Sequence, residues 1–130
     1  MTFRLALPAL TLLSACATTP APANPGESTW TFVAIDGQRP VSSKTTLTIS
    51  ETRIGANVGC NGMGGDLKFD KGRLIVGPVV STQMYCDGVM DQERAVAELL
   101  EAGPYFFIEN GRMTMRSDKH SAELVRKVED

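Results

Sequence analysis

Short runs of alternating apolar and polar residues, separated by turn sequences, recur along most of this 130-residue chain. Residues 45–50 place Leu47 and Ile49 on one face and hydroxyl side chains on the other, which is typical of a half-buried strand. Asn110-Gly111 joins two further runs and favours a tight hairpin. The pattern shows no strand-helix-strand alternation. We therefore predict a mainly β (α+β) fold, a small antiparallel β-barrel or curled sheet of about eight strands with one helix packed against it.

The helix pattern covers residues 88–102. Asp87 is placed to cap its first turn, and Gly103 followed by proline ends it. An apolar stripe is expected to face the sheet, while Glu93 and Glu98 are expected to face water.

Residues 1–15 are predicted to be a lipoprotein signal peptide. A start with one positive charge precedes an apolar stretch that is too short to span a bilayer and suits a signal sequence. Leu13-Ser14-Ala15-Cys16 resembles the bacterial lipobox, in which the cysteine thiol receives a lipid and cleavage occurs just before it. The alternative is an ordinary secretory signal that contains a cysteine. We interpret Cys16 as the lipidation site.

Residues 16–28 are interpreted as the lipidated cysteine and a flexible tether, because they are rich in proline and alanine and contain no large apolar side chain. The folded domain is predicted to cover residues 29–130. Several acyl chains would anchor such a domain stably to a bilayer. In the sorting rule of enteric bacteria, Ala17 after the lipidated cysteine indicates the outer membrane. The expected location is therefore the cell envelope, on the outer membrane facing the periplasm.

Two cysteines, Cys60 and Cys86, remain once Cys16 carries lipid. An oxidising compartment favours a disulfide between them. Free buried thiols and a redox or nucleophilic role are the alternatives.

Five glycines at positions 55, 59, 62, 64 and 65 form the densest glycine cluster of the chain. They allow positive φ and close backbone approach, so we predict a bulged corner of the barrel. A phosphate-binding loop is the alternative, but no Lys-Ser/Thr pair follows. Asn61 is expected to be a turn residue that bonds to nearby backbone, with ligand binding as the alternative.

The composition argues against several functions. With 13 basic and 15 acidic side chains and no long run of either sign, the chain has no basic face for nucleic acid. Its single histidine, His120, lies in a polar turn and is expected to be an exposed surface residue. Three cysteines and one histidine do not favour a metal centre. We predict no enzymatic activity, no metal and no cofactor.

Several motifs occur together in one order. Trp30-Thr31-Phe32, Gly59-Cys60-Asn61 and the Tyr105 hairpin are similar to segments of one family. Residues 29–127 resemble the META domain of HslJ-like bacterial lipoproteins. The residues that match the two central motifs of that family are Gly59, Cys60, Asn61, Gly64, Thr82, Met84 and Cys86.

The resemblance implies a β-rich barrel against one helix and an envelope location, with no established catalytic activity. Members of the family are associated with heat-shock induction and antibiotic tolerance. We therefore expect a monomeric, non-enzymatic envelope lipoprotein, bound to the membrane through its lipid, that supports stress or antibiotic tolerance by contacting an envelope protein. The alternative is a carrier of lipid or a small apolar ligand in the barrel interior, lined by Phe32, Phe106 and Met115.

Overall fold

The computed structural model describes residues 8, 11 and 25–128. The expected signal peptide, the lipidation site Cys16 and most of the tether lie outside the described residues. Within them, one helix accompanies nine strands. The strands are β1 Ser28–Ile35, β2 Thr46–Ile49, β3 Arg53–Asn57, β4 Gly62–Asp70, β5 Arg73–Val76, β6 Val80–Ser81, β7 Tyr105–Glu109, β8 Arg112–Arg116 and β9 Ser121–Arg126. The helix, α1, covers Met90–Glu101.

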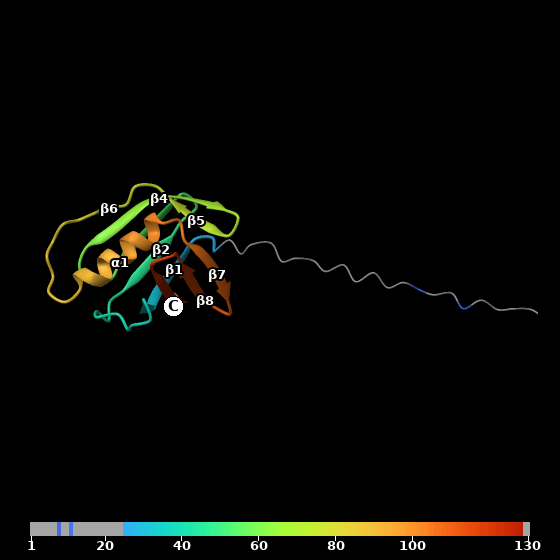
Figure 1. The fold of residues 1–130 in the computed structure, drawn as a ribbon, viewed down its shortest axis with the longest axis horizontal. Coiled ribbons are helices and arrows are strands. Elements are labelled where there is room, and N and C mark those ends of the chain that lie inside the picture. Colours follow the sequence, from blue (N-terminus) through green and yellow to red (C-terminus); the bar gives the residue numbers. More distant parts are fainter. Residues whose placement is uncertain (1–7, 9–10, 12–24, 129–130) are drawn as a thin grey trace, which may run out of the picture.

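Antiparallel pairing closes the sheet into a barrel (Figure 1). The order β3-β2-β1-β9-β8-β7-β5-β4 returns to β3, so eight strands form the ring. The short strand β6 pairs with β4 beyond the end of β5, on the far side of the Gly77-Pro78 break. The predicted small antiparallel barrel with one helix is therefore confirmed.

Strand pairing in the ring is shortest between β5 and β7, where Arg73 and Tyr105 are the one pair in register. In the sequence, α1 directly precedes β7, and in the fold it packs against β5 and β1. Figure 1 shows α1 alongside the strands. Among the described residues, no helix has the length and apolar character needed to cross a membrane.

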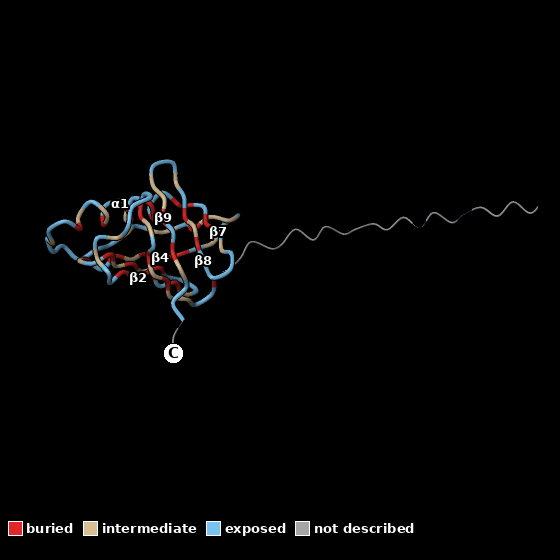
Figure 2. Tube along the Cα trace, turned by 90° about the horizontal axis from the view of Figure 1, so that it is seen from below, coloured by how far each residue is buried: buried red, intermediate tan, exposed pale blue. Residues whose placement is uncertain are grey.

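The barrel interior is filled by one hydrophobic core, which runs through the molecule as the red segments of Figure 2. Alternation along the strands directs these side chains inward, so Leu47 and Ile49 of β2 lie in the core as predicted. The three residues expected to line a ligand cavity, Phe32, Phe106 and Met115, are also buried in this core.

One local prediction was wrong, and another was right only in part. The helix begins at Met90 with Val89 as its N-cap, and no side chain caps it, so Asp87 does not have the predicted role. The glycine cluster is only in part a corner: Gly59, with a φ of 126°, lies in the bend between β3 and β4, whereas Gly62 to Gly65 form the first half of β4. There a Cβ atom on Gly64 would lie 2.9 Å from the carbonyl oxygen of Ile54 in β3, which explains why this strand contains glycine.

Candidate functional site

Asn61 is buried and lies at the centre of a network that joins three distant segments. Its Oδ1 accepts hydrogen bonds from the Thr82 hydroxyl and the Met84 backbone N–H, both at 2.8 Å. Its Nδ2 donates to the Met84 carbonyl oxygen at 2.9 Å and to Glu93 Oε1 at 2.6 Å. The predicted contacts with nearby backbone are therefore replaced by contacts with residues 21 to 32 positions away.

Glu93 is the helical member of this network. It is 8% exposed, although it was predicted to face water. Its Oε2 accepts the backbone N–H of Asn61 at 3.0 Å, so both carboxylate oxygens bind the same residue. The helical spacing shows why: Glu93 follows Val89 by four positions and precedes Val96 by three, which places it on the buried face of α1. An acidic residue on an apolar stripe was the feature in the sequence that could have revealed it.

The disulfide between Cys60 and Cys86 closes the other side of the same segment. Together with Asn61, it fixes the β6–α1 loop, residues 82–89, to the segment between β3 and β4. The loop nevertheless presents apolar side chains to solvent, because Met84 is 58% exposed and Tyr85 is 80% exposed. Val80 of β6, just before the loop, is 74% exposed. We call Val80, Met84 and Tyr85 the apolar tip.

A second cluster surrounds His120 in the turn between β8 and β9. Its Nδ1 lies 2.8 Å from Asp36 Oδ2, and its Nε2 lies 2.7 Å from Glu98 Oε2. The ring is 19% exposed, although it was predicted to be an exposed surface residue. The local sequence gives no indication of these contacts, because Asp36 and His120 are 84 positions apart.

Within this cluster, the contacts favour a protonated His120 and an ionised Asp36. Hydrogen bonds with Glu98 and then Asp36 raise the pKa of His120 above its usual value of 6.5, against the opposing effect of burial. Burial alone would raise the pKa of Asp36, but hydrogen bonds from the Ser121 backbone N–H and from His120 outweigh it and lower the pKa.

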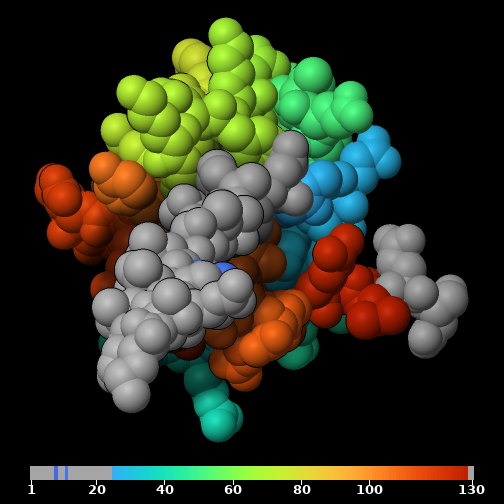
Figure 3. All heavy atoms as spheres, turned by 90° about the vertical axis from the view of Figure 1, so that its right-hand side faces the viewer, coloured from blue at the N-terminus to red at the C-terminus, as the bar shows by residue number. Residues whose placement is uncertain are grey.

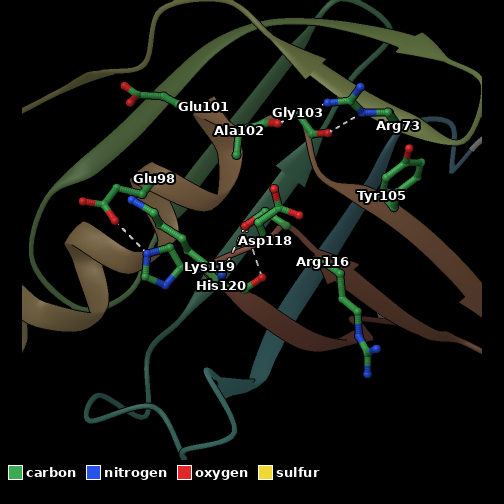
Figure 4. A pocket seen from close by; sticks show the side chains of 11 residues that line it. Arg73, Glu98, Glu101, Ala102, Gly103, Tyr105, Arg116, Asp118, Lys119 and His120 are labelled. Atoms are coloured by element: carbon green, nitrogen blue, oxygen red, sulfur yellow. Dashed lines mark hydrogen bonds and ion pairs between the residues drawn. The ribbon is translucent and has the colours of Figure 1, made fainter.

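A pocket of about 720 Å³ opens beside His120, between the end of α1, strand β7 and the β8–β9 turn (Figure 4). Arg73 contributes one wall. Its Nε donates to the Gly103 carbonyl oxygen at 2.8 Å, and its guanidinium lies 5.3 Å from the centre of the Tyr105 ring. Phe32, Phe106 and Met115 do not line this pocket.

The structure separates the groups that a cysteine hydrolase would need. Cys60 is bonded to Cys86, so its sulfur is not a free nucleophile, and His120 contacts two carboxylates. Among the described residues, no group of three or more histidine, cysteine or acidic side chains is arranged to hold a metal ion.

We call the Cys60–Cys86 disulfide, together with the contacts between Asn61 and Glu93, the clasp. The fold is a small closed β-barrel whose helical segment is joined to the strands by this clasp. The META domain family matches residues 23–129, and the chain belongs to this family. No curated protein sequence matches the chain.

Two structures solved by NMR have a similar fold. One, from Burkholderia xenovorans, is 23% identical, with a TM-score of 0.66, and the match covers 90% of this chain and 97% of that one. The other is 18% identical, with a TM-score of 0.68, and the match covers 76% of this chain and 88% of that one. At these identities the likeness concerns the fold.

Proposed function

We propose that this META domain is a non-catalytic envelope lipoprotein, attached through Cys16 to the outer membrane and facing the periplasm. In this proposal it supports stress or antibiotic tolerance by contacting an envelope protein through the apolar tip. The partner offers a complementary apolar surface, since the tip contributes a valine, a methionine and a tyrosine side chain.

The exposure of a rigidly held apolar loop is the observation that carries this proposal. When a partner covers exposed apolar groups, the free energy of the system falls. The backbone of Met84 is fixed in this exposed loop, because Asn61 holds the N–H and carbonyl oxygen of that residue. The disulfide at Cys86 fixes the other end. A surface fixed before binding loses less conformational entropy on binding.

The filled core favours this function over a carrier. Trp30, Leu47 and Met115 have no exposed surface at the centre of the barrel. A lipid in the interior would have to displace such side chains, each of which contributes about 1.5–3 kcal/mol when buried.

Site-specific photo-crosslinking in intact envelopes tests the proposal. A photoreactive amino acid at Gln83, inside the β6–α1 loop, is expected to form a protein adduct of defined mass. The additional changes Met84→Ser and Tyr85→Ser should remove the adduct, because they delete the apolar contact surface and leave the disulfide and Asn61 unchanged.

The matched control is Phe107 on β7, which is 66% exposed. In Figure 1, β7 lies on the right of the molecule and the β6–α1 loop on the left, and Figure 3 looks onto the right-hand side. A photoreactive group at Phe107 should give no such adduct. Equal adducts from both positions, or an adduct that survives the two serine substitutions, would contradict the proposal. Lipid extracted with the purified protein would instead favour the carrier.

A further inference from the structure

The two contacts of His120 carry information about its protonation. A neutral imidazole has one N–H donor and one acceptor nitrogen. Both ring nitrogens here face carboxylate oxygens, at 2.8 Å on Asp36 and 2.7 Å on Glu98, and a carboxylate only accepts. Both contacts are hydrogen bonds only when the ring carries two protons.

The contacts join three parts of the fold. Asp36 lies in the turn after β1, Glu98 lies in α1, and His120 lies in the turn before β9. We propose that His120 is a proton-dependent latch, which ties the C-terminal half of α1 to the barrel while the ring is doubly protonated and releases it when one proton passes to solvent.

The structure indicates which contact is given up. Asp36 is also held by the Ser121 backbone, because its Oδ1 accepts the Ser121 N–H at 2.9 Å and its own N–H donates to the Ser121 carbonyl oxygen at 2.8 Å. The Glu98 carboxylate has no second partner within the described residues, and half of its side chain is exposed. The neutral ring therefore keeps its remaining N–H on Asp36 and loses Glu98. The element that loses a contact is therefore α1, at Glu98.

Other charged groups lie near His120 without contacting its ring. Arg73 of β5 is bound to the carbonyl oxygens of Gly103 and Ala102. Within the described residues, no ion pair involves the remaining charges that line the pocket. They are Glu101 of α1, Arg116 of β8, and Asp118 and Lys119 of the β8–β9 turn, while Tyr105 of β7 is the other titratable side chain there. Of the residues that the structure describes, only Asp36 and Glu98 are in hydrogen-bond contact with the ring.

The direction of the pH dependence follows from the contacts. Hydrogen bonds with Glu98 and Asp36 raise the pKa of folded His120 above 6.5. The stabilisation from the latch is therefore complete below pH 6.5 and disappears as pH rises through the raised pKa of the folded state. Release frees the Glu98 carboxylate at the rim of the pocket.

NMR titration of the folded domain tests the latch. The His120 ring nitrogens should have the chemical shifts of a doubly protonated ring below the midpoint, and the midpoint should lie above 6.5. In Glu98→Gln the midpoint should fall, because the largest stabilising contact loses its charge. Lys119→Gln is the matched control, since it changes an adjacent charge that the ring does not contact, and its midpoint should not fall.

Hydrogen exchange provides the structural measurement. After correction for intrinsic rates, protection of the amides at residues 98–102 should drop as pH passes the His120 midpoint. In His120→Gln it should stay low and unchanged with pH. A midpoint at or below 6.5, or the same pH-dependent loss of protection in His120→Gln, would overturn the proposal.

Discussion

Asn61 uses the whole hydrogen-bonding capacity of its side chain. An amide offers two donors and an oxygen with two acceptor positions, and here each has a partner. Two of these bonds hold the backbone of Met84, and one holds the buried carboxylate of Glu93. Aspartate has a similar shape but lacks the two N–H donors, so it cannot replace asparagine at this position.

Asn61→Asp is therefore expected to destabilise the domain. The substitution places a second carboxylate against Glu93 Oε1, where the present separation is 2.6 Å, and leaves the Met84 carbonyl without its donor. At neutral pH the free energy of unfolding should fall by about 2–4 kcal/mol. Urea denaturation should show a smaller loss at acidic pH, where the two carboxyl groups can share a proton.

Asn57→Asp is the matched control for this change. Asn57 uses its Oδ1 to accept the Gly59 backbone N–H at 2.8 Å, and aspartate keeps that acceptor. Its effect should stay within about 0.5 kcal/mol. Similar losses for both substitutions would show that negative charge near the clasp, rather than the lost donors, explains the effect.

Two glycines of β4 should respond differently to alanine. A Cβ on Gly64 would lie 2.9 Å from the backbone oxygen of Ile54, whereas a Cβ on Gly62 would have no atom within 4 Å. We expect Gly64→Ala to lower the free energy of unfolding by about 1–3 kcal/mol, because β3 must move away. Gly62→Ala should change it by less than about 0.5 kcal/mol. Chemical denaturation of the pair measures the difference, and equal effects would contradict the close approach.

Among the elements of the fold, the disulfide joins the segment between β3 and β4 to the loop before α1. It closes 26 positions of sequence. The double variant Cys60→Ser, Cys86→Ser should lower the free energy of unfolding by about 3–4 kcal/mol, because the unfolded chain regains the entropy of that loop. Circular dichroism should show the strands intact, while hydrogen exchange accelerates at residues 82–89.

The wild-type protein treated with a reductant provides the control, since it should unfold at the same urea concentration as the double variant. If the oxidised and reduced proteins unfolded at the same concentration, the disulfide would contribute nothing to stability.

The strands were predictable because their determinants are local. Alternation directs Leu47 and Ile49 inward, and Asn110 with Gly111 forms the turn between β7 and β8. The partners of Asn61 and His120 were not predictable in this way. They lie on other elements, and only the closure of the barrel brings them together. Alternation identifies the inward face of a strand but carries no information about which distant side chain will approach its end.

Closure of the barrel as a whole depends on the short pairing between β5 and β7, which we call the seam. β1 and β9 pair over most of their length, whereas β5 and β7 pair only at Arg73 and Tyr105. Arg73 reinforces this seam by donating to the last carbonyl oxygens after α1, where the helix has no basic residue of its own. A positive charge at a helix C-terminus is stabilising. One side chain thus joins β5, the helix end and β7.

The barrel should therefore open first between β5 and β7, and Arg73→Ala should make that opening easier. The amides of Leu74 and Phe106, which bond across the seam to Pro104 and Gly72, are expected to exchange faster in the variant. Amides between β1 and β9 should keep their wild-type rates, since the change does not reach them. Arg112→Ala in β8 is the control, because it removes an exposed arginine that has no ion pair within residues 25–128. Uniform acceleration over all strands would show that the barrel unfolds as one cooperative unit without a weak seam.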